Sequence, residues 1–330
     1  MKKQSAIRIL VLFLGLFQAS IYAQYGGFNK VGTTSFQFLK VAPNARVSAM
    51  GGASATIINS SEAVFFNPAG LTKTSGVNMA ISYMDYFLDV NLSSFSMAYT
   101  IKGMGTIGLQ AVANNIGEIQ ETRADHLYRD EATGEYNPGL TGRTINPSSM
   151  VIGLSFARDV TDKFTFGLTA KYVREDLVVK AASAVIFDGG LIYKTGFKSL
   201  VLGAMLQHFG KEIKYFDKAY PLPQTLAVGV SGYLLAPEGA FLMTSTDHTL
   251  LLAYDMVQAR DHSQQQHLGM EYVFNNLLAL RCGYKIFYDE ENVTFGAGIT
   301  VNRFRLDYAY NDFGEYLDAV HRFTLGWIIK

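Results

Sequence analysis

A glycine-rich string in the first third of the chain has the spacing of a nucleotide-binding loop. Gly103, Gly105 and Gly108 satisfy the pattern GxGxxG, which holds a pyrophosphate when the N-terminus of a helix follows and faces the phosphates. Here the residues that follow have the pattern of a β-strand, so no helix N-terminus is available. We predict no dinucleotide site and no cofactor.

Two histidines and one charge pair could also carry chemistry. His262 and His267 flank a polar loop, but a metal site would need further ligands that spacing cannot show, so we expect solvated histidines and no metal. Arg305 and Asp307 have side chains of types used in catalysis. Because both lie on one face of one predicted strand, we interpret them as part of a charge network in a barrel lumen, and we predict no catalytic residue and no enzyme.

Apolar residues alternate with small or polar residues, with a period of two, in several segments of the chain. Phe164, Phe166 and Leu168 alternate with Thr165 and Gly167, and the same alternation recurs at 293–301, 304–310 and 323–329. Large side chains point to lipid in a membrane barrel, whereas they fill the core of a soluble one. Glycine, threonine and charge share the opposite face here, which suits a wetted or plugged lumen. The charged residues expected in the lumen are Lys171, Glu271, Arg281, Lys285, Arg305 and Asp307.

Alternation and turn residues together predict an all-β fold, a 14-stranded antiparallel transmembrane β-barrel over residues 76–330. A periplasmic β-sandwich or propeller is the alternative, although no blade-length repeat supports a propeller. The predicted strands lie near 76–83, 88–101, 104–114, 148–159, 164–176, 182–195, 200–209, 224–235, 248–257, 266–274, 278–288, 293–301, 304–312 and 320–329.

The composition narrows the class of protein further. Hydrophobic residues make up 49% of the chain, charged residues 17%, and the formal net charge is zero. No segment supplies the clustered basic face that a nucleic-acid partner would need. Cys282 is the only cysteine, so we expect no intramolecular disulfide and interpret this residue as part of the barrel wall.

The amino terminus has the order of a secretory signal peptide. Lys2, Lys3 and Arg8 precede the apolar run Ile9–Phe17, and small residues follow it. We predict a signal peptide over residues 1–23 with cleavage after Ala23. Export, followed by insertion of a barrel into lipid, predicts a location in the cell outer membrane.

Residues 24–75 differ in character from the strands and predict a short helical hatch or plug beneath or inside the barrel. Pro43 can open one helical turn, which Gly51 and Gly52 close. Asn59 and Glu62 can cap a second turn, which Asn67 and Pro68 end. The run that we call the hatch motif comprises Phe66, Asn67, Pro68, Ala69 and Gly70.

The connections alternate between short and long, as in bacterial barrels with short periplasmic turns and long extracellular loops. The longest is Asn115–Pro147, which the strand count places outside the cell. We predict that this irregular loop binds a partner protein through apolar anchors, with a lid or mobile loop as the alternative. The anchors are Leu127, Tyr128, Tyr136 and Leu140.

Several segments together resemble the PorV/PorQ family, which belongs to the wider FadL-like barrels. Thr34–Met50 (TSFQFLKVAPNARVSAM) and Phe66–Leu71 (FNPAGL) look like the opening of that family. The resemblance continues through later segments in the same order, at Tyr83–Asn91, Tyr220–Gly229, Leu278–Tyr284, Leu306–Gly314 and His321–Gly326. It implies a 14-stranded outer-membrane barrel with an amino-terminal hatch.

The resemblance also implies a function without catalysis. PorV/PorQ-like proteins serve type IX secretion, so the chain is expected to dock secretion-system components or exported cargo proteins through its extracellular loops. The FadL-like ancestry implies an alternative, a channel for uptake of hydrophobic small molecules past the hatch. An apolar pocket reached from outside would favour the channel, whereas a blocked lumen with shaped loops would favour docking.

Overall fold

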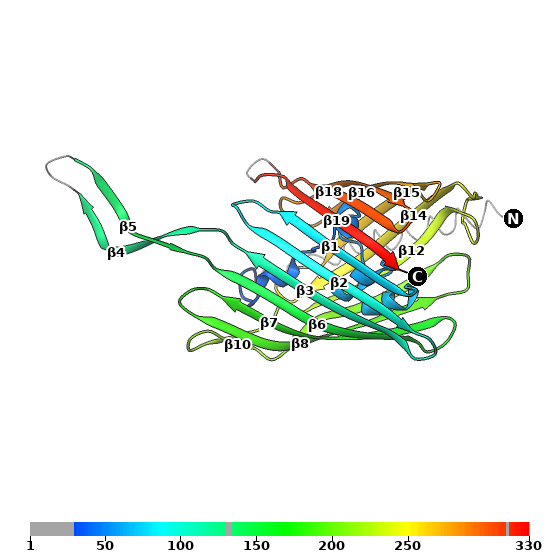
Figure 1. Cartoon of the computed structure of the whole chain (residues 1–330), viewed down its shortest axis with the longest axis horizontal. Coiled ribbons are helices and arrows are strands. Elements are labelled where there is room, and N and C mark those ends of the chain that lie inside the picture. The colour runs from blue at the N-terminus through cyan, green and yellow to red at the C-terminus, as the bar shows by residue number, and fades with distance from the viewer. Residues whose placement is uncertain (1–29, 130–133, 315–316, 330) are drawn as a thin grey trace.

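Fourteen antiparallel strands close into a barrel in the computed structural model (Figure 1), which describes residues 30–129, 134–314 and 317–329. The predicted signal peptide, with its cleavage after Ala23, lies outside the described residues. The barrel closes where β12 pairs with β9. Its strands are β1 (Val77–Asp85), β2 (Asn91–Ile101), β3 (Gly105–Asn115), β6 (Ser148–Asp159), β7 (Phe164–Asp176), β8 (Ala181–Lys194), β9 (Val201–Gly210), β12 (Thr225–Ala236), β14 (His248–Ala259), β15 (Gln265–Phe274), β16 (Leu278–Ile286), β17 (Val293–Val301), β18 (Phe304–Asn311) and β19 (Val320–Ile329).

The predicted strands and their facing are confirmed. On β7, Leu168 is 52% exposed on the outer face, while the neighbouring Thr169 and Lys171 are 2% and 4% exposed on the inner face. Phe187 and Leu154 continue the outer apolar surface on adjacent strands. Large side chains therefore point outward, and the β-sandwich and propeller alternatives are wrong. A closed barrel with this apolar outer surface supports a location in the outer membrane.

The two ends of the barrel differ in the length of their connections (Figure 1). One end has tight turns, among them Asn275–Asn276 and Asn302, whose φ angles of 50°, 52° and 55° place them in the left-handed region that asparagine tolerates. The connection between β12 and β14 is longer and contains β13 (Met243–Thr244). The other end has long loops, including the hairpin of β10 (Ile213–Lys214) and β11 (Ala219–Tyr220). No helix in the described residues is long and apolar enough to cross a bilayer.

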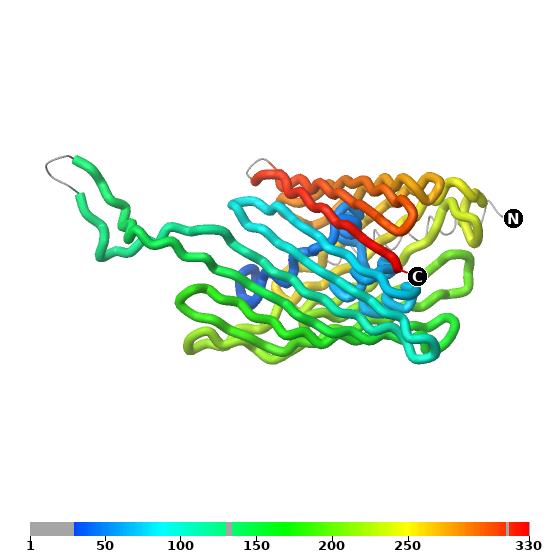
Figure 2. Tube along the Cα trace, in the orientation of Figure 1, coloured from blue at the N-terminus to red at the C-terminus, as the bar shows by residue number. Residues whose placement is uncertain are grey.

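The longest connection is a β-hairpin, and its prediction as an irregular loop is wrong. β4 (Ile119–Arg129) and β5 (Tyr136–Ile145) pair with each other and extend away from the barrel (Figure 2). The pairing has two register shifts, one on each side of Thr122. β3 and β6 pair directly down to Asn115 and Ser148, so the hairpin is an addition to a wall that is complete without it.

Residues 30–75, which we call the inner segment, lie inside the barrel (Figure 1). They form four short helices: η1 (Gln37–Lys40), α2 (Ala45–Ala49), η2 (Ser61–Phe65) and η3 (Pro68–Lys73). The side chain of Asn44 caps α2 by accepting a hydrogen bond from the Val47 amide at 2.7 Å. Gly51 and Gly52, with φ angles of 65° and 83°, follow α2 as the sequence predicts.

Two details of the predicted hatch helices are wrong. Ser60, not Asn59, precedes η2. Glu62 forms no capping box: it is 1% exposed, and its carboxylate accepts a hydrogen bond from the Ser60 hydroxyl at 2.7 Å. Pro68 begins η3 as well as following η2, because its fixed φ suits the first position of a helix.

Glycines on the inner face of the strands let the inner segment approach the wall closely. A Cβ on Gly283 would lie 2.0 Å from the Gly51 amide nitrogen, and one on Gly203 would lie 2.4 Å from the Ala55 carbonyl oxygen. Any larger residue would collide with backbone atoms. The glycines that alternate with large residues in the sequence therefore seat the inner segment.

Candidate functional site

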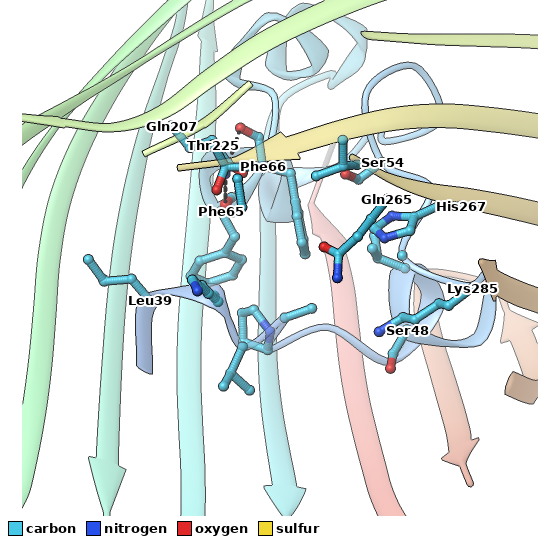
Figure 3. Close-up of a pocket in the computed structure, with 18 of the residues that line it drawn as sticks. Leu39, Ser48, Ser54, Phe65, Phe66, Gln207, Thr225, Gln265, His267 and Lys285 are labelled. Carbon is cyan, nitrogen blue, oxygen red and sulfur yellow. Dashed lines mark hydrogen bonds between the residues drawn. The ribbon is translucent and has the colours of Figure 1, made fainter. Parts of the chain in front are cut away.

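A cavity of about 610 Å³ lies between the inner segment and the barrel wall. It is within the size range of sites that hold small organic molecules. Figure 3 shows Leu39, Phe65 and Phe66 on one side and Ser48, His267 and Lys285 on the other. The first side is mainly apolar, with Gln207 and Thr225 also on it, and the other side is mainly polar.

The apolar side combines residues from both parts of the protein. Phe65 and Phe66 of the inner segment pack edge to face, with ring centroids 6.4 Å apart. Their neighbours in the lining are aromatic and aliphatic, so this side can exchange water for an apolar ligand. The further apolar lining residues are Phe38, Leu39, Val41, Val47, Val112, Val151, Met205 and Val257.

The loops between strands contribute more aromatic residues to the lining. Tyr86 follows β1, Phe287 follows β16 and Phe313 follows β18. The rings of Tyr86, Phe87 and Phe313 pack against one another, with centroids 4.0 to 5.8 Å apart. An aromatic cluster therefore borders the cavity on the long-loop end of the barrel.

The polar side contains an ordered group of hydrogen bonds. Lys285 pairs with Glu291 at 2.6 Å, and Asn311 donates to the same carboxylate at 3.0 Å. The carbonyl oxygen of the Asn311 side chain accepts from Ser48 and from Arg322. Although burial alone would raise it, the pKa of Glu291 is lowered because Lys285 stabilises the charged form.

Four of the six predicted lumen charges form one network. Glu271 pairs with Arg281 at 2.6 Å, Arg281 with Asp307 at 2.8 Å, and Asp307 with Arg305 at 2.6 Å. Arg46 of the inner segment joins this network at Glu271, at 2.7 Å. Glu62, also of the inner segment, joins it through an ion pair with Arg305.

The other two predicted lumen charges lie elsewhere on the inner face. Lys171 forms an ion pair with Asp188 on the neighbouring strand, and Lys285 belongs to the polar side of the cavity. All six predicted residues point inward, but only Lys171 and Lys285 line the cavity. The four-residue network instead fastens the inner segment to β15, β16 and β18.

The inner segment also contacts the barrel at Asp261, in the loop between β14 and β15, and this contact was not predicted from the sequence. Its carboxylate accepts hydrogen bonds from Thr34 at 2.8 Å, from Gln37 at 3.1 Å, and from Lys40. Burial alone would raise its pKa, but these donors and His262 hold it far below its usual range. The first turn of the inner segment is therefore tied to one loop carboxylate.

The hatch motif has a mainly structural position. Asn67 caps η3 by accepting from the Ala69 amide at 3.1 Å, and it donates to the Ala55 carbonyl at 2.6 Å. A Cβ on Gly70 would lie 2.4 Å from the Ile58 carbonyl oxygen, so this glycine permits a close turn of the inner segment on itself. Pro68 and Ala69 lie against Gly167 of the wall. Phe66 lines the cavity.

The predicted partner residues lie far from the cavity lining, on the β4–β5 hairpin. Leu127, Tyr128 and Tyr136 are 52%, 60% and 65% exposed, and Leu140 is 38% exposed. Arg123 pairs with Asp125 on the same hairpin. The hairpin thus presents exposed aromatic and aliphatic residues at a distance from the barrel.

The remaining chemical motifs have structural positions. His267 is buried and its Nε2 lies 2.8 Å from the Tyr288 hydroxyl, so its prediction as a solvated loop histidine is wrong. His262 lies 3.0 Å from Asp261. In the described ranges no cluster of His, Cys, Asp and Glu is placed to hold a metal ion. Gly103 lies in the β2–β3 turn and Gly105 begins β3, so a strand follows the glycine-rich turn as predicted.

Neither a family model nor a curated protein matches the sequence. Solved structures do match the fold. The toluene transporter TbuX of Ralstonia pickettii is 14% identical, with a TM-score of 0.61 over 90% of this chain and 100% of that one. The CymD monoaromatic hydrocarbon channel is 12% identical, with a TM-score of 0.56 over 89% and 99%. The toluene transporter TodX of Pseudomonas putida is 14% identical, with a TM-score of 0.55 over 85% and 95%.

The chain therefore shares the barrel fold of these transporters and channels. At such low identity the likeness concerns the fold. The narrower resemblance to PorV/PorQ rests on the sequence segments alone.

Proposed function

We propose that this protein is a non-enzymatic outer-membrane channel for hydrophobic small molecules. The observation that carries the proposal is the cavity of about 610 Å³ between the inner segment and the wall, with an apolar side lined by residues such as Phe65, Phe66 and Met205. A docking protein would need no such chamber. In this proposal residues 24–75 act as the hatch, and the cavity is the first binding chamber for a solute entering from the long-loop end.

The structures of similar fold support the same proposal. These proteins are two toluene transporters and a monoaromatic hydrocarbon channel. Apolar solutes cross the polar outer surface of an outer membrane slowly. A chamber inside a barrel gives them an apolar site to enter.

The proposal is tested by filling the cavity. Val112 lines it from β3, whereas Leu109 on the same strand faces outward and is 36% exposed. A strain lacking the protein is complemented with wild type, Val112→Trp or Leu109→Trp, and uptake of radiolabelled naphthalene is measured. We expect Val112→Trp to reduce uptake to the level of the deletion strain, and Leu109→Trp to match wild type. Unchanged uptake by a correctly folded Val112→Trp protein would refute the channel.

The β4–β5 hairpin favours a second function, docking of partner proteins. Tyr128 and Tyr136 are largely exposed on a two-stranded element that no other strand in the described chain flanks. Such aromatic side chains are enriched at protein interfaces. By its resemblance to PorV/PorQ proteins, the chain would then bind components or cargo of a type IX-like secretion system. Loss of secreted proteins from the deletion strain, with naphthalene uptake unchanged, would favour this function over the channel.

A further inference from the structure

We propose that the solute held in the cavity is an organic anion with a ring-containing body, its acidic group beside Arg322 and Lys285. This inference rests on the proposed channel and names its substrate class. The proteins of similar fold are named for neutral aromatic solutes. The polar side of this cavity, however, carries a positive charge that a neutral solute would leave unbalanced.

Arg322 is the first part of the argument. It lines the cavity from β19 and is 3% exposed. Its guanidinium donates to the Ala42 carbonyl at 3.2 Å and to the Asn311 side chain. Both acceptors are neutral, and none of the ion pairs found in the described chain involves Arg322. A buried guanidinium that forms no direct ion pair is costly, and an anionic ligand in contact with it would offset that cost.

The neighbouring charges do not supply the missing anion. Glu291 interacts electrostatically with Arg322, but its ion pair is with Lys285, at 2.6 Å. Within this hydrogen-bonded group one carboxylate therefore faces two cations, and the group retains one positive charge. Asp289 also lines the cavity, but it is exposed and does not belong to this group. The Asn311 amide is held between both sides, because it donates to Glu291 and accepts from Arg322 and Ser48. The arrangement is thus preorganised, with its cations fixed before a ligand arrives.

The rest of the cavity lining indicates that the non-acidic part of the ligand contains a ring. Seven aromatic rings border this single chamber of about 610 Å³: Phe38, Phe65, Phe66, Tyr86, Phe287, Tyr288 and Phe313. Aromatic side chains favour offset or edge-to-face contact with another ring. A compact aromatic acid can reach these rings and the two cations together, so we commit to a ring-containing anion in preference to an extended chain.

Three probes of similar size separate the parts of this inference. Binding of 2-naphthoate, naphthalene and decanoate is measured at neutral pH with the full protein in phosphatidylcholine nanodiscs, and binding to empty discs is subtracted. We expect 2-naphthoate to bind roughly tenfold or more tightly than naphthalene, as an ion pair with a buried cation requires, and more tightly than decanoate. Equal binding of 2-naphthoate and naphthalene would refute the anion site, and tighter binding of decanoate would refute the ring-containing body.

Variants assign the effect to the named residues. Arg322→Met should remove the advantage of 2-naphthoate over naphthalene. Arg322→Lys keeps the positive charge and should retain most of the advantage of 2-naphthoate. It also tests the site if Arg322→Met fails to fold. Arg303→Gln is the matched control, since Arg303 is an exposed cation in the β17–β18 turn and does not line the cavity.

The outcome also separates this inference from the proposed channel. If naphthalene binds and 2-naphthoate has no advantage, the channel stands and the anion site is refuted. If neither naphthalene nor 2-naphthoate binds, both are refuted. An advantage that survives Arg322→Met would show that the acidic group lies elsewhere and would overturn the site described here.

Discussion

The guanidinium of Arg46 donates two hydrogen bonds to the carboxylate of Glu271, at 2.7 and 2.8 Å. Arg46 belongs to α2 of the inner segment and Glu271 to β15 of the wall, 225 positions apart in the sequence. Glu271 is also paired with Arg281 of the neighbouring strand. A two-point contact of this kind fixes orientation as well as distance, so it defines how α2 sits in the barrel.

Arg46→Met should destabilise the folded protein by about 2 to 5 kcal/mol, because it removes one partner of a buried, hydrogen-bonded ion pair. The measurement is the temperature at which the barrel loses its heat-modifiable mobility in gel electrophoresis. Arg123→Met is the control: Arg123 forms an exposed ion pair with Asp125 on the hairpin, and we expect a loss of less than about 1 kcal/mol. Equal shifts for the two variants would show that Arg46 does not anchor the inner segment.

Gly283→Ala should destabilise the protein by about 3 kcal/mol, because the added methyl group would lie 2.0 Å from the Gly51 amide nitrogen. Gly189→Ala is a matched change on a distant strand of the wall, β8, where the nearest atom is the Leu168 side chain at 3.6 Å. The same gel assay compares the two. A Gly283→Ala barrel as heat-resistant as Gly189→Ala would mean that the inner segment does not press against β16.

Acid should release the start of the inner segment only at unusually low pH. The carboxylate of Asp261 has a folded-state pKa far below its ordinary value of about 3.9, so it binds protons less readily in the folded protein. Its stabilising contribution is therefore complete above that ordinary value and is lost as pH falls through the folded-state pKa. The protection of the amides at residues 34–40 against hydrogen exchange, relative to the intrinsic exchange rate at the same pH, should stay high at pH 4.

Asp261→Asn provides the comparison for this pH dependence. The variant lacks the charge that pairs with Lys40, so the protection of residues 34–40, corrected for the intrinsic exchange rate at each pH, should be lower than in wild type at neutral pH and should change little with acid. If wild type has already lost this protection at pH 4, Asp261 does not hold this turn in the way the hydrogen bonds indicate.

The sequence was sufficient to predict the barrel strands because each one has a lipid face and a lumen face. On β7 the alternation of Leu168 with Thr169 records both environments directly. The hairpin strand β4 was missed for the same physical reason. Nearly all of its residues are exposed on both faces, so Ile119–Arg129 shows no alternation between apolar and polar residues. The segment therefore lacks the pattern from which the barrel strands were predicted.

The inner-segment contacts depend on pairings that local sequence does not encode. Arg46 and Glu62 carry no pattern that connects them with Glu271 or Arg305 on distant strands. Lys171 is different. Its partner Asp188 lies on the adjacent strand β8, two residues from Ile186, which is directly opposite Lys171. The predicted hairpin of β7 and β8 could therefore have revealed that pair, whereas the cavity required the folded inner segment.

The hairpin can be removed without opening the wall, because β3 and β6 pair with each other directly from Asn115 and Ser148 onward. Replacing residues 120–142 with a short Gly/Ser turn should therefore leave the heat-modifiable barrel intact. It should also leave naphthalene uptake unchanged, since none of the deleted residues that the structure describes lines the cavity. A matched variant, Tyr128→Ser with Tyr136→Ser, keeps the hairpin and removes only its two exposed rings.

If the hairpin docks a partner protein, both variants should lose proteins that copurify with wild type, because exposed aromatic anchors contribute much of the energy of an interface. Loss with the deletion alone would assign the contact to the hairpin backbone. Altered naphthalene uptake with partners retained would make the hairpin a lid of the channel, the alternative to a docking element. A deletion variant that no longer folds would contradict the direct β3–β6 pairing as the support of this part of the wall.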